Sequence, residues 1–166
     1  LKLHVDATYP LEHALDARNF GKSALDHTLP WHVCMYLSRA LRVRTCMDPH
    51  VEDRLTSLYA AQLEETGEWH WAVFVLLHLL HDQVRAQAVQ ALLARHVDVL
   101  DAHSAFLTTT LHVDETWLWQ ARALAAHARS DYFAEYECRR HARDLSGAHA
   151  VAVRHLAAES FLRGDT

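Results

Sequence analysis

Residues 48–67 read DPHVEDRLTSLYAAQLEETG, and they contain the most clearly bounded helix in the sequence. Asp48 can cap the first turn, and Pro49 suits the position after it because proline lacks a backbone N–H that would need a partner. Gly67 can end the helix in a left-handed conformation. The apolar residues between these ends share one helical stripe, which comprises Val51, Leu55, Leu58 and Tyr59. The stretch therefore predicts an amphipathic helix.

The next segment, residues 69–80, is apolar on nearly every side of a helix. A helix of that kind is usually covered by neighbours, so we expect it to lie inside a stack of helices. Its apolar run is interrupted by His78 and falls short of the roughly 20 residues that a membrane span needs. No transmembrane segment is predicted.

Further helix signals occur throughout the rest of the chain. Starts are expected near Thr28 and Pro30, Asp82, residue 102, Asp114, Ser130 or Asp131, and Ser146, and the recognisable pattern ends at Gly164. The connections between these segments are short, which favours antiparallel neighbours, and no strict repeat recurs. We predict an all-α fold of irregular stacked helical hairpins, an α-solenoid.

Residues 1–166 are expected to form a single helical domain that is a fragment of a larger one. Residues 1–27 would be a connecting segment with a short helix, and residues 28–166 would be the stacked helices. The expectation of a fragment rests on the first residues, which open within an apolar run. With only 4 Gly and 3 Pro among 166 residues, turns are too scarce for a β-sandwich or barrel.

Composition argues against several functional classes. The formal net charge of −5 gives no general attraction to nucleic acid. Cys34, Cys46 and Cys138 are odd in number and far apart, so neither a zinc knuckle nor a disulfide framework is indicated. The glycines are isolated, and neither a nucleophile elbow nor a Glu-x-x-His pair occurs. The sequence predicts no enzyme, no cofactor and no catalytic residue; the 15 histidines have no assigned role.

The strongest metal candidate combines His78, His81 and Asp82, since residues three apart share a helix face. The alternative is that His78 fills a helix interface while the other two residues end the helix. Because no further ligand lies nearby in the sequence, we predict no metal site.

Two sets of residues follow from the helical pattern. The predicted structural core comprises Leu58, Tyr59, Leu63, Trp71, Phe74, Leu77, Leu92, Trp117 and Leu124. Replacement of Trp71 or Phe74 by Ala would then destabilise the fold by about 3–5 kcal/mol. The candidate protein-interface residues, which flank the predicted stripes or form a basic cluster, are Trp69, Trp119, Arg139, Arg140 and Arg143.

A family resemblance covers nearly the whole chain. The segments that carry it are residues 58–64, Gly67 and residues 71–79, followed in order by parts of 88–96, 106–113, 121–131 and 154–157, with 9–12 and 29–32 upstream. These segments resemble the scaffold nucleoporin of the Y-shaped nuclear pore subcomplex, which is released in many organisms from a precursor that also encodes a phenylalanine-glycine-repeat nucleoporin. The fit is loosest over residues 137–146, where charged residues replace the more apolar hairpin of relatives.

The resemblance implies an ancestral coatomer element fold, of which this chain would be the later trunk and tail. It also implies a location at the nuclear pore complex, peripheral to the nuclear envelope. The tail would contact the short-arm nucleoporins at the hub of the Y, whereas a β-propeller partner and a stem nucleoporin would bind segments outside this chain. A helical adaptor of COPII-like vesicle coats is the alternative, because it would share the fold.

Overall fold

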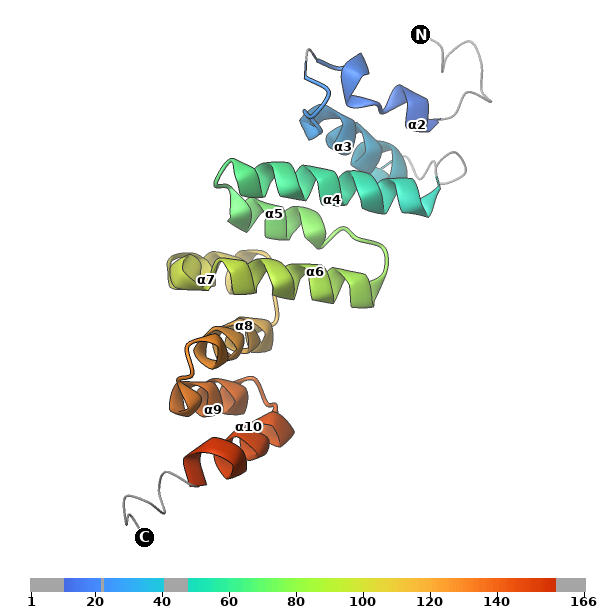
Figure 1. The fold of residues 1–166 in the computed structure, drawn as a ribbon. Helices are drawn as coiled ribbons and strands as arrows, with labels where there is room; N and C mark the ends of the chain where they lie inside the picture. Colours follow the sequence, from blue (N-terminus) through green and yellow to red (C-terminus); the bar gives the residue numbers. More distant parts are fainter. Residues whose placement is uncertain (1–10, 22, 41–47, 158–166) are drawn as a thin grey trace. The chain divides into compact units, whose positions relative to one another are not determined.

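The computed structural model describes residues 11–21, 23–40 and 48–157, and these residues are helical throughout, with turns between the helices and no strand among them. The predicted all-α fold is thereby confirmed (Figure 1). The chain divides into two compact units, Leu1–Ala86 and Gln87–Thr166, and the division falls within helix α6. The single domain expected from the sequence stays a prediction. Each unit is described by itself below.

The first unit consists of short and long helices in chain order. They are α2 (Leu11–Ala14), η1 (Ala17–Asn19), α3 (Thr28–Met35), the π-helical turn η2 (Tyr36–Ala40), α4 (Pro49–Glu65), α5 (Trp69–Leu76) and the start of α6 (Asp82–Arg95). In Figure 1, α4 and α5 lie side by side and are joined by a short turn. They form the central hairpin of this unit.

The ends of α4 arise from local chemistry, as the sequence predicts. Asp48 Oδ1 accepts a hydrogen bond from the backbone N–H of His50 at 3.0 Å, which satisfies a donor that the first turn leaves without a partner. At the other end Gly67 has φ of +85°, a conformation that a side chain would disfavour. The chain can therefore turn at once into α5.

The core of the first unit is built from one face of each helix. Its buried residues include Trp31 and Cys34 on α3, Leu55, Thr56 and Tyr59 on α4, and Trp69, Ala72, Val73 and Val75 on α5. Burial raises the pKa of the Cys34 thiol to about 12, so this cysteine is an inert core residue.

The second unit contains the remaining helices. After the rest of α6 come η4 (Val97–Val99), α7 (Leu100–Ala105), the π-helical turn η5 (Phe106–Thr110), α8 (Glu115–Ala128), α9 (Tyr132–His141), α10 (Leu145–Val151) and η6 (Ala152–Leu156). Helix α9 packs against both α8 and α10, and short turns join all three. This is the antiparallel hairpin arrangement expected from the short connections.

Aspartates cap α8, α9 and α10 in this second unit. Asp114 accepts from the N–H of Thr116, and Asp131 accepts from that of Ala134, at the predicted starts of α8 and α9. The helix start expected at Ser146 is wrong by one residue, because α10 begins at Leu145. Its cap is Asp144, whose Oδ1 accepts a hydrogen bond from the backbone N–H of Gly147 at 2.9 Å. Aspartate and serine are both good caps, so the pattern alone did not distinguish them.

Two other predicted helix starts differ from the structure, and one predicted end falls on a residue that the structure does not describe. Asp82 is the first residue of α6 rather than the residue before it, and the helix expected from residue 102 begins at Leu100 and ends in a π-helical turn. The pattern end at Gly164 lies outside the described residues.

Burial corrects part of the predicted core. Tyr59 and Leu92 are buried, whereas Leu63, Leu77 and Trp117 are half-buried. Four others are exposed: Leu58 by 40%, Trp71 by 45%, Phe74 by 36% and Leu124 by 58%. The error has one physical source, because periodicity groups residues on a helix face but does not say whether a neighbour covers that face.

Candidate protein-binding surfaces

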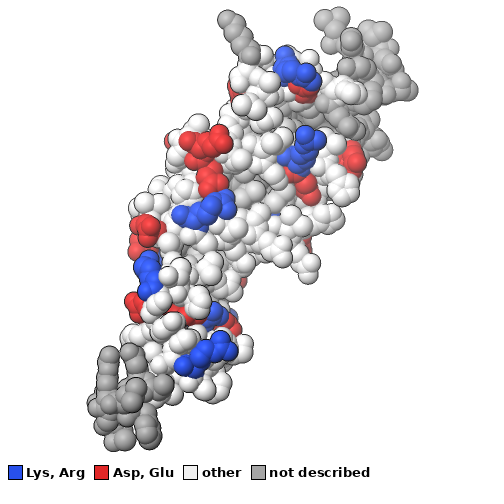
Figure 2. Space-filling view, in the orientation of Figure 1, with Lys and Arg blue, Asp and Glu red and all other residues white. Residues whose placement is uncertain are grey.

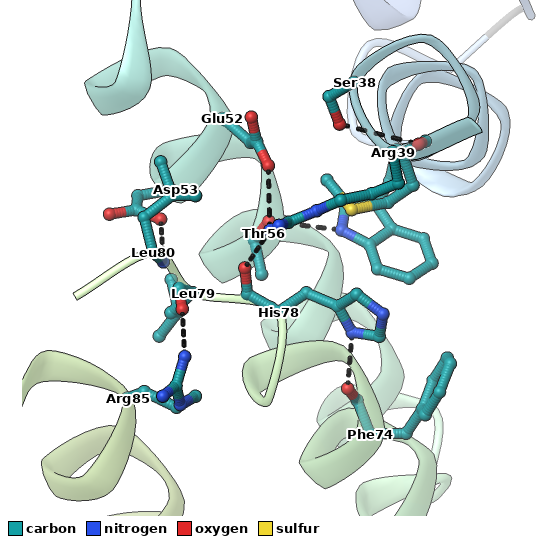
Figure 3. Close-up of polar contacts among 12 residues, drawn as sticks. Ser38, Arg39, Glu52, Asp53, Thr56, Phe74, His78, Leu79, Leu80 and Arg85 are labelled. Carbon is teal, nitrogen blue, oxygen red and sulfur yellow. Dashed lines mark hydrogen bonds and ion pairs between the residues drawn. The ribbon is translucent and has the colours of Figure 1, made fainter. Parts of the chain in front are cut away.

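The linker between α5 and α6 is held by side chains from three helical elements of the first unit (Figure 3). Asp53 Oδ1 accepts the N–H of Leu80 at 2.9 Å, and Arg85 Nη1 donates to the Leu79 carbonyl at 2.9 Å. Arg39 Nη2 donates to the His78 carbonyl at 3.2 Å. Three backbone groups of this linker are therefore paired with protein side chains, which fixes its position.

The same region is tied to α3 and α4. Trp31, exposed by only 3%, donates from Nε1 to Thr56 Oγ1 at 3.2 Å, which satisfies the one polar atom of a buried indole. Arg39 also pairs with Glu52 at 3.3 Å. These contacts make α3, α4 and the linker one connected polar and aromatic cluster.

An aromatic surface lies beside this cluster on α5. Phe74 makes edge contacts with Trp71 and with His78, at ring centroid distances of 6.2 Å and 4.8 Å. Trp31 meets both Phe74 and His78 from the core side. The half-exposed Trp71 and Phe74 thus form the outer part of a packed aromatic group, a composition typical of protein interfaces.

The candidate metal ligands of the sequence analysis have other contacts. His78 Nδ1 lies 2.9 Å from the Phe74 carbonyl, and its ring packs edge-on against Trp31. His81 is exposed, and Asp82 pairs with Arg85. Within the part of the chain that the structure describes, no three His, Cys, Asp or Glu side chains are grouped so as to hold a metal ion.

The second unit contains a cleft at the end of the α8–α9 hairpin where α8 begins. Its volume is about 430 Å³, and it is lined by Asp114, Glu115, Thr116, Trp119, His141 and Arg143. The Trp119 and His141 rings stack with centroids 4.5 Å apart and 22° between their planes. The structure therefore brings together Trp119 and Arg143, two of the residues that the sequence analysis proposed for protein binding.

Trp119 is further held by its own helix. The Arg122 guanidinium carbon lies 4.5 Å from the centroid of its ring, and Arg122 is itself paired with Asp101. Trp119 Nε1 donates to Glu115 Oε1 at 3.3 Å. An indole with this many contacts is a rigid surface, so a partner that covers it would lose little side-chain entropy.

Arg139, another candidate interface residue, is part of an ion-pair network within the hairpin. Its Nε donates to Glu135 Oε1 at 2.8 Å, and its Nη1 donates to Asp144 Oδ2 at 2.7 Å. Glu135 is 1% exposed and lies 2.9 Å from His127 Nδ1. Burial by itself raises the pKa of Glu135, but the hydrogen bonds from His127 and Arg139 outweigh burial and lower it.

The other two candidate interface residues, Trp69 and Arg140, differ in their exposure to solvent. Trp69, expected to be exposed, is buried at 5% because it faces the core at the start of α5. Arg140 is exposed; it pairs with Glu137 at 3.2 Å and lies near the Tyr136 ring. On the face shown in Figure 2, basic side chains lie beside acidic ones rather than in a broad basic area.

Sequence reasoning missed the left-handed residues. His112, Ser130 and Arg143 have φ of 55°, 58° and 60°, and each follows a helix at a position that commonly holds glycine. It also missed the buried Glu135 network, for which the only sequence signal is the spacing of four between Glu135 and Arg139.

Taken together, these features define a class of protein, the all-helical proteins built from antiparallel hairpins. The two units are antiparallel helical hairpins with apolar cores, ion-paired edges and partly exposed aromatic side chains at a helix face or hairpin end. Among the described helices, none combines the length and apolar character that a membrane crossing requires. Proteins built from stacked helical hairpins commonly present extended surfaces for binding other proteins.

Comparison with known proteins identifies the family. Residues 1–125 match the family model described as nuclear protein 96. The chain is 33% identical to the nuclear pore complex protein Nup98-Nup96 of Drosophila melanogaster over 99% of its own length, and 31% identical to the nucleoporin nup189 of Schizosaccharomyces pombe over 86%. It is 33% identical to the Nup98-Nup96 protein of Dictyostelium discoideum over 72%. The chain belongs to the nuclear protein 96 family.

The matched region is a small part of these relatives. The chain spans 8%, 9% and 6% of their respective lengths. At the level of the family, the comparison confirms the predicted class of nucleoporin and its nuclear pore location.

Proposed function

We propose that this chain is a structural scaffold segment of the Y-shaped outer-ring coat of the nuclear pore complex. It would bind neighbouring nucleoporins through helical surfaces and so support transport of protein and mRNA without contacting cargo. The observation that carries the proposal is the family match over residues 1–125, in a chain whose described residues form helical hairpins. The proposal includes no catalysis and no cofactor.

The partners in this proposal are those that the family resemblance implies. The later part of the chain, with the cleft beside Trp119, would contact the short-arm nucleoporins at the hub of the Y. The β-propeller partner and the stem nucleoporin would bind segments outside this chain. The net charge of −5 and the paired arginines support protein partners rather than direct contact with nucleic acid.

The exposed aromatic surface of α5 supports the same proposal. Trp71 and Phe74 are exposed by 45% and 36%, yet both are packed within an aromatic group that limits their motion. Aromatic side chains of this kind commonly supply the central contacts of protein interfaces.

Affinity purification of the full-length parent protein from nuclear envelopes, followed by mass spectrometry, tests the proposal. Recovery of the β-propeller partner with other Y-complex nucleoporins, in constant proportion to the parent, is the expected result. Recovery of vesicle-coat subunits without nucleoporins would contradict it and favour the coat adaptor that shares the fold.

A further inference from the structure

A pocket in the second unit is lined mainly by basic and apolar residues of α8, α9, α10 and η6. Its volume is about 260 Å³, and its lining residues are His127, Glu135, Arg139, Gly147, Ala150, Val151, Arg154 and His155. Two arginines and two histidines thus surround one carboxylate, that of Glu135, and the three residues from α10 have no polar side chain.

The carboxylate in this pocket is already paired within the chain. Glu135 is 1% exposed, its Oε1 accepts from Arg139 Nε at 2.8 Å, and its Oε2 lies 2.9 Å from His127 Nδ1. Arg139 also donates to Asp144 at 2.7 Å, but Asp144 does not line the pocket. A buried carboxylate with two donors has little charge left to attract a cation from solution.

The charge that remains in the pocket is that of Arg154. This residue is exposed and forms no ion pair with any described residue. Asp144 lies at the other end of the helical stretch formed by α10 and η6, roughly 15 Å away along its axis, which exceeds the Debye length of about 8 Å in physiological salt. The pocket therefore presents a positive charge that no described carboxylate compensates.

The shape and chemistry of the pocket suit a single acidic side chain. Its volume is below the roughly 300 Å³ at which small-molecule sites begin, so a cofactor or metabolite would not be enclosed. The surfaces of Ala150 and Val151 can cover the aliphatic stem of an incoming Asp or Glu. The guanidinium of Arg154 offers a planar fork of N–H donors that matches the carboxylate.

Exposed apolar side chains lie at the same end of the unit. Val153 precedes Arg154 and is 59% exposed. Phe133 is 67% exposed and follows Tyr132, whose ring stacks on His155 with centroids 3.8 Å apart and 7° between the planes. Aromatic and apolar residues beside a charged site are the usual composition of a protein interface, so the partner that supplies the acid would be a protein.

We propose that this pocket receives an acidic side chain, Asp or Glu, of a neighbouring nucleoporin, whose carboxylate pairs with Arg154 while its stem packs on Ala150 and Val151. The inference rests on the proposed function for the nature of the partner. Opposite-charge pairing within a larger interface fixes register more than it adds affinity, so the pocket would select which neighbour binds.

A matched pair of variants of the full-length parent tests the proposal, each purified from nuclear envelopes with quantitative mass spectrometry. Arg154→Gln removes the charge and should lower the recovery of one Y-complex nucleoporin about fivefold, with the largest loss at low salt. Arg129→Gln is the control, because Arg129 is also exposed and does not line the pocket. It removes the same charge and should leave every recovery unchanged. Both variants should keep the melting temperature of the unmodified parent.

Carbodiimide cross-linking identifies the acid directly. Arg154→Lys keeps the positive charge and places a primary amine at the pocket, which the reagent joins to a carboxylate in contact with it. Lys2 and Lys22 are the only lysines of this chain, so few amines compete. We expect a cross-link from position 154 to an Asp or Glu of the nucleoporin that Arg154→Gln loses. Arg129→Lys should give no cross-link to that acid.

The outcomes distinguish the pocket from the general function. If the unmodified parent recovers no nucleoporin, the proposed function fails. If it recovers them and Arg154→Gln does so equally well, the docking site fails. Equal losses with Arg154→Gln and Arg129→Gln would show a general attraction between charged surfaces, which also overturns the proposal. So would a cross-link from position 154 only to acids of the parent itself, because the pocket would then be filled from within.

Discussion

Asp53 and Leu80 are 27 positions apart, and the Asp53 carboxylate accepts the backbone N–H of Leu80 at 2.9 Å. This contact ties the second turn of α4 to the linker that leads into α6. It matters because the same linker carries His78, which packs on the exposed aromatic surface of α5. The position of that surface therefore depends on a side chain from another helix.

Replacing Asp53 by Ala should destabilise the chain by about 1–2 kcal/mol, since the half-buried Leu80 N–H would lose its acceptor. Asp53→Asn retains an acceptor oxygen and should cost less. Urea unfolding followed by circular dichroism measures both. Equal losses for the two variants would mean that the charge of Asp53, rather than its hydrogen bond, is what stabilises the linker.

The buried hydrogen bond from Trp31 to Thr56 gives a second prediction. Thr56→Val keeps the shape of the side chain but leaves Trp31 Nε1 without an acceptor, so we expect a loss of about 1–3 kcal/mol. Thr56→Ser should be milder because it keeps the hydroxyl. A double-mutant cycle with Trp31→Phe isolates the pair, and a coupling energy near zero would argue against this hydrogen bond.

Corrected burial changes the prediction for α5. Trp71→Ala and Phe74→Ala should each destabilise the chain less than the roughly 2–5 kcal/mol expected of Leu92→Ala, because Leu92 is 1% exposed and the two aromatics are 45% and 36% exposed. Thermal unfolding ranks the three variants. If Trp71→Ala matched Leu92→Ala, the aromatic surface would contribute to the core rather than to binding.

The free energy of unfolding should fall as the pH is lowered, because Glu135 becomes protonated. Its pKa is lowered in the folded chain relative to the ordinary 4.5, so its ionised form stabilises the fold above that value. This contribution is lost as the pH falls through the lowered folded pKa. Asp114 and Asp144, whose pKa values are also lowered, act in the same direction.

Urea unfolding at a series of pH values, with Glu135→Gln as the comparison, measures this contribution. The variant should be less stable than the natural chain at pH 7 and should approach it in acid, where Glu135 is protonated. A constant difference between the two at every pH would show that Glu135 acts through packing and not through its charge.

Gly147 and Gly67 make a matched pair of substitutions. A Cβ at Gly147 would overlap Asp144 Oδ2 and lie 2.5 Å from Arg139 Nη1, so Gly147→Ala should disrupt the cap of α10. At Gly67 nothing lies within 4 Å, and Ala there should cost only about 1 kcal/mol, for the left-handed backbone. Thermal unfolding compares the two, and we expect the larger loss at Gly147. An equal or smaller loss at Gly147 would mean that the Asp144–Arg139 ion pair moves aside at little cost.

Much of the fold was predictable because helix ends are local. Asp48, Asp114 and Asp131 cap the helices that follow them, through hydrogen bonds to residues two or three positions on. The family could also be recognised, since residues spread along nearly the whole chain carry the resemblance. Trp119 and Arg143, both named from the sequence, line the same cleft, and their part in protein binding stays a prediction.

What the sequence by itself determined is therefore the helical class, the starts of α3, α4, α8 and α9, and the family. The tertiary structure alone decided that Trp69 is buried while Trp71 is exposed, and that Arg139 lies in a network with the buried Glu135 while Arg143 lines a cleft. The physical reason is that capping depends on atoms a few residues away along the chain. Burial and ion pairing depend on which helix covers which face, and that is fixed by contacts between residues distant in sequence.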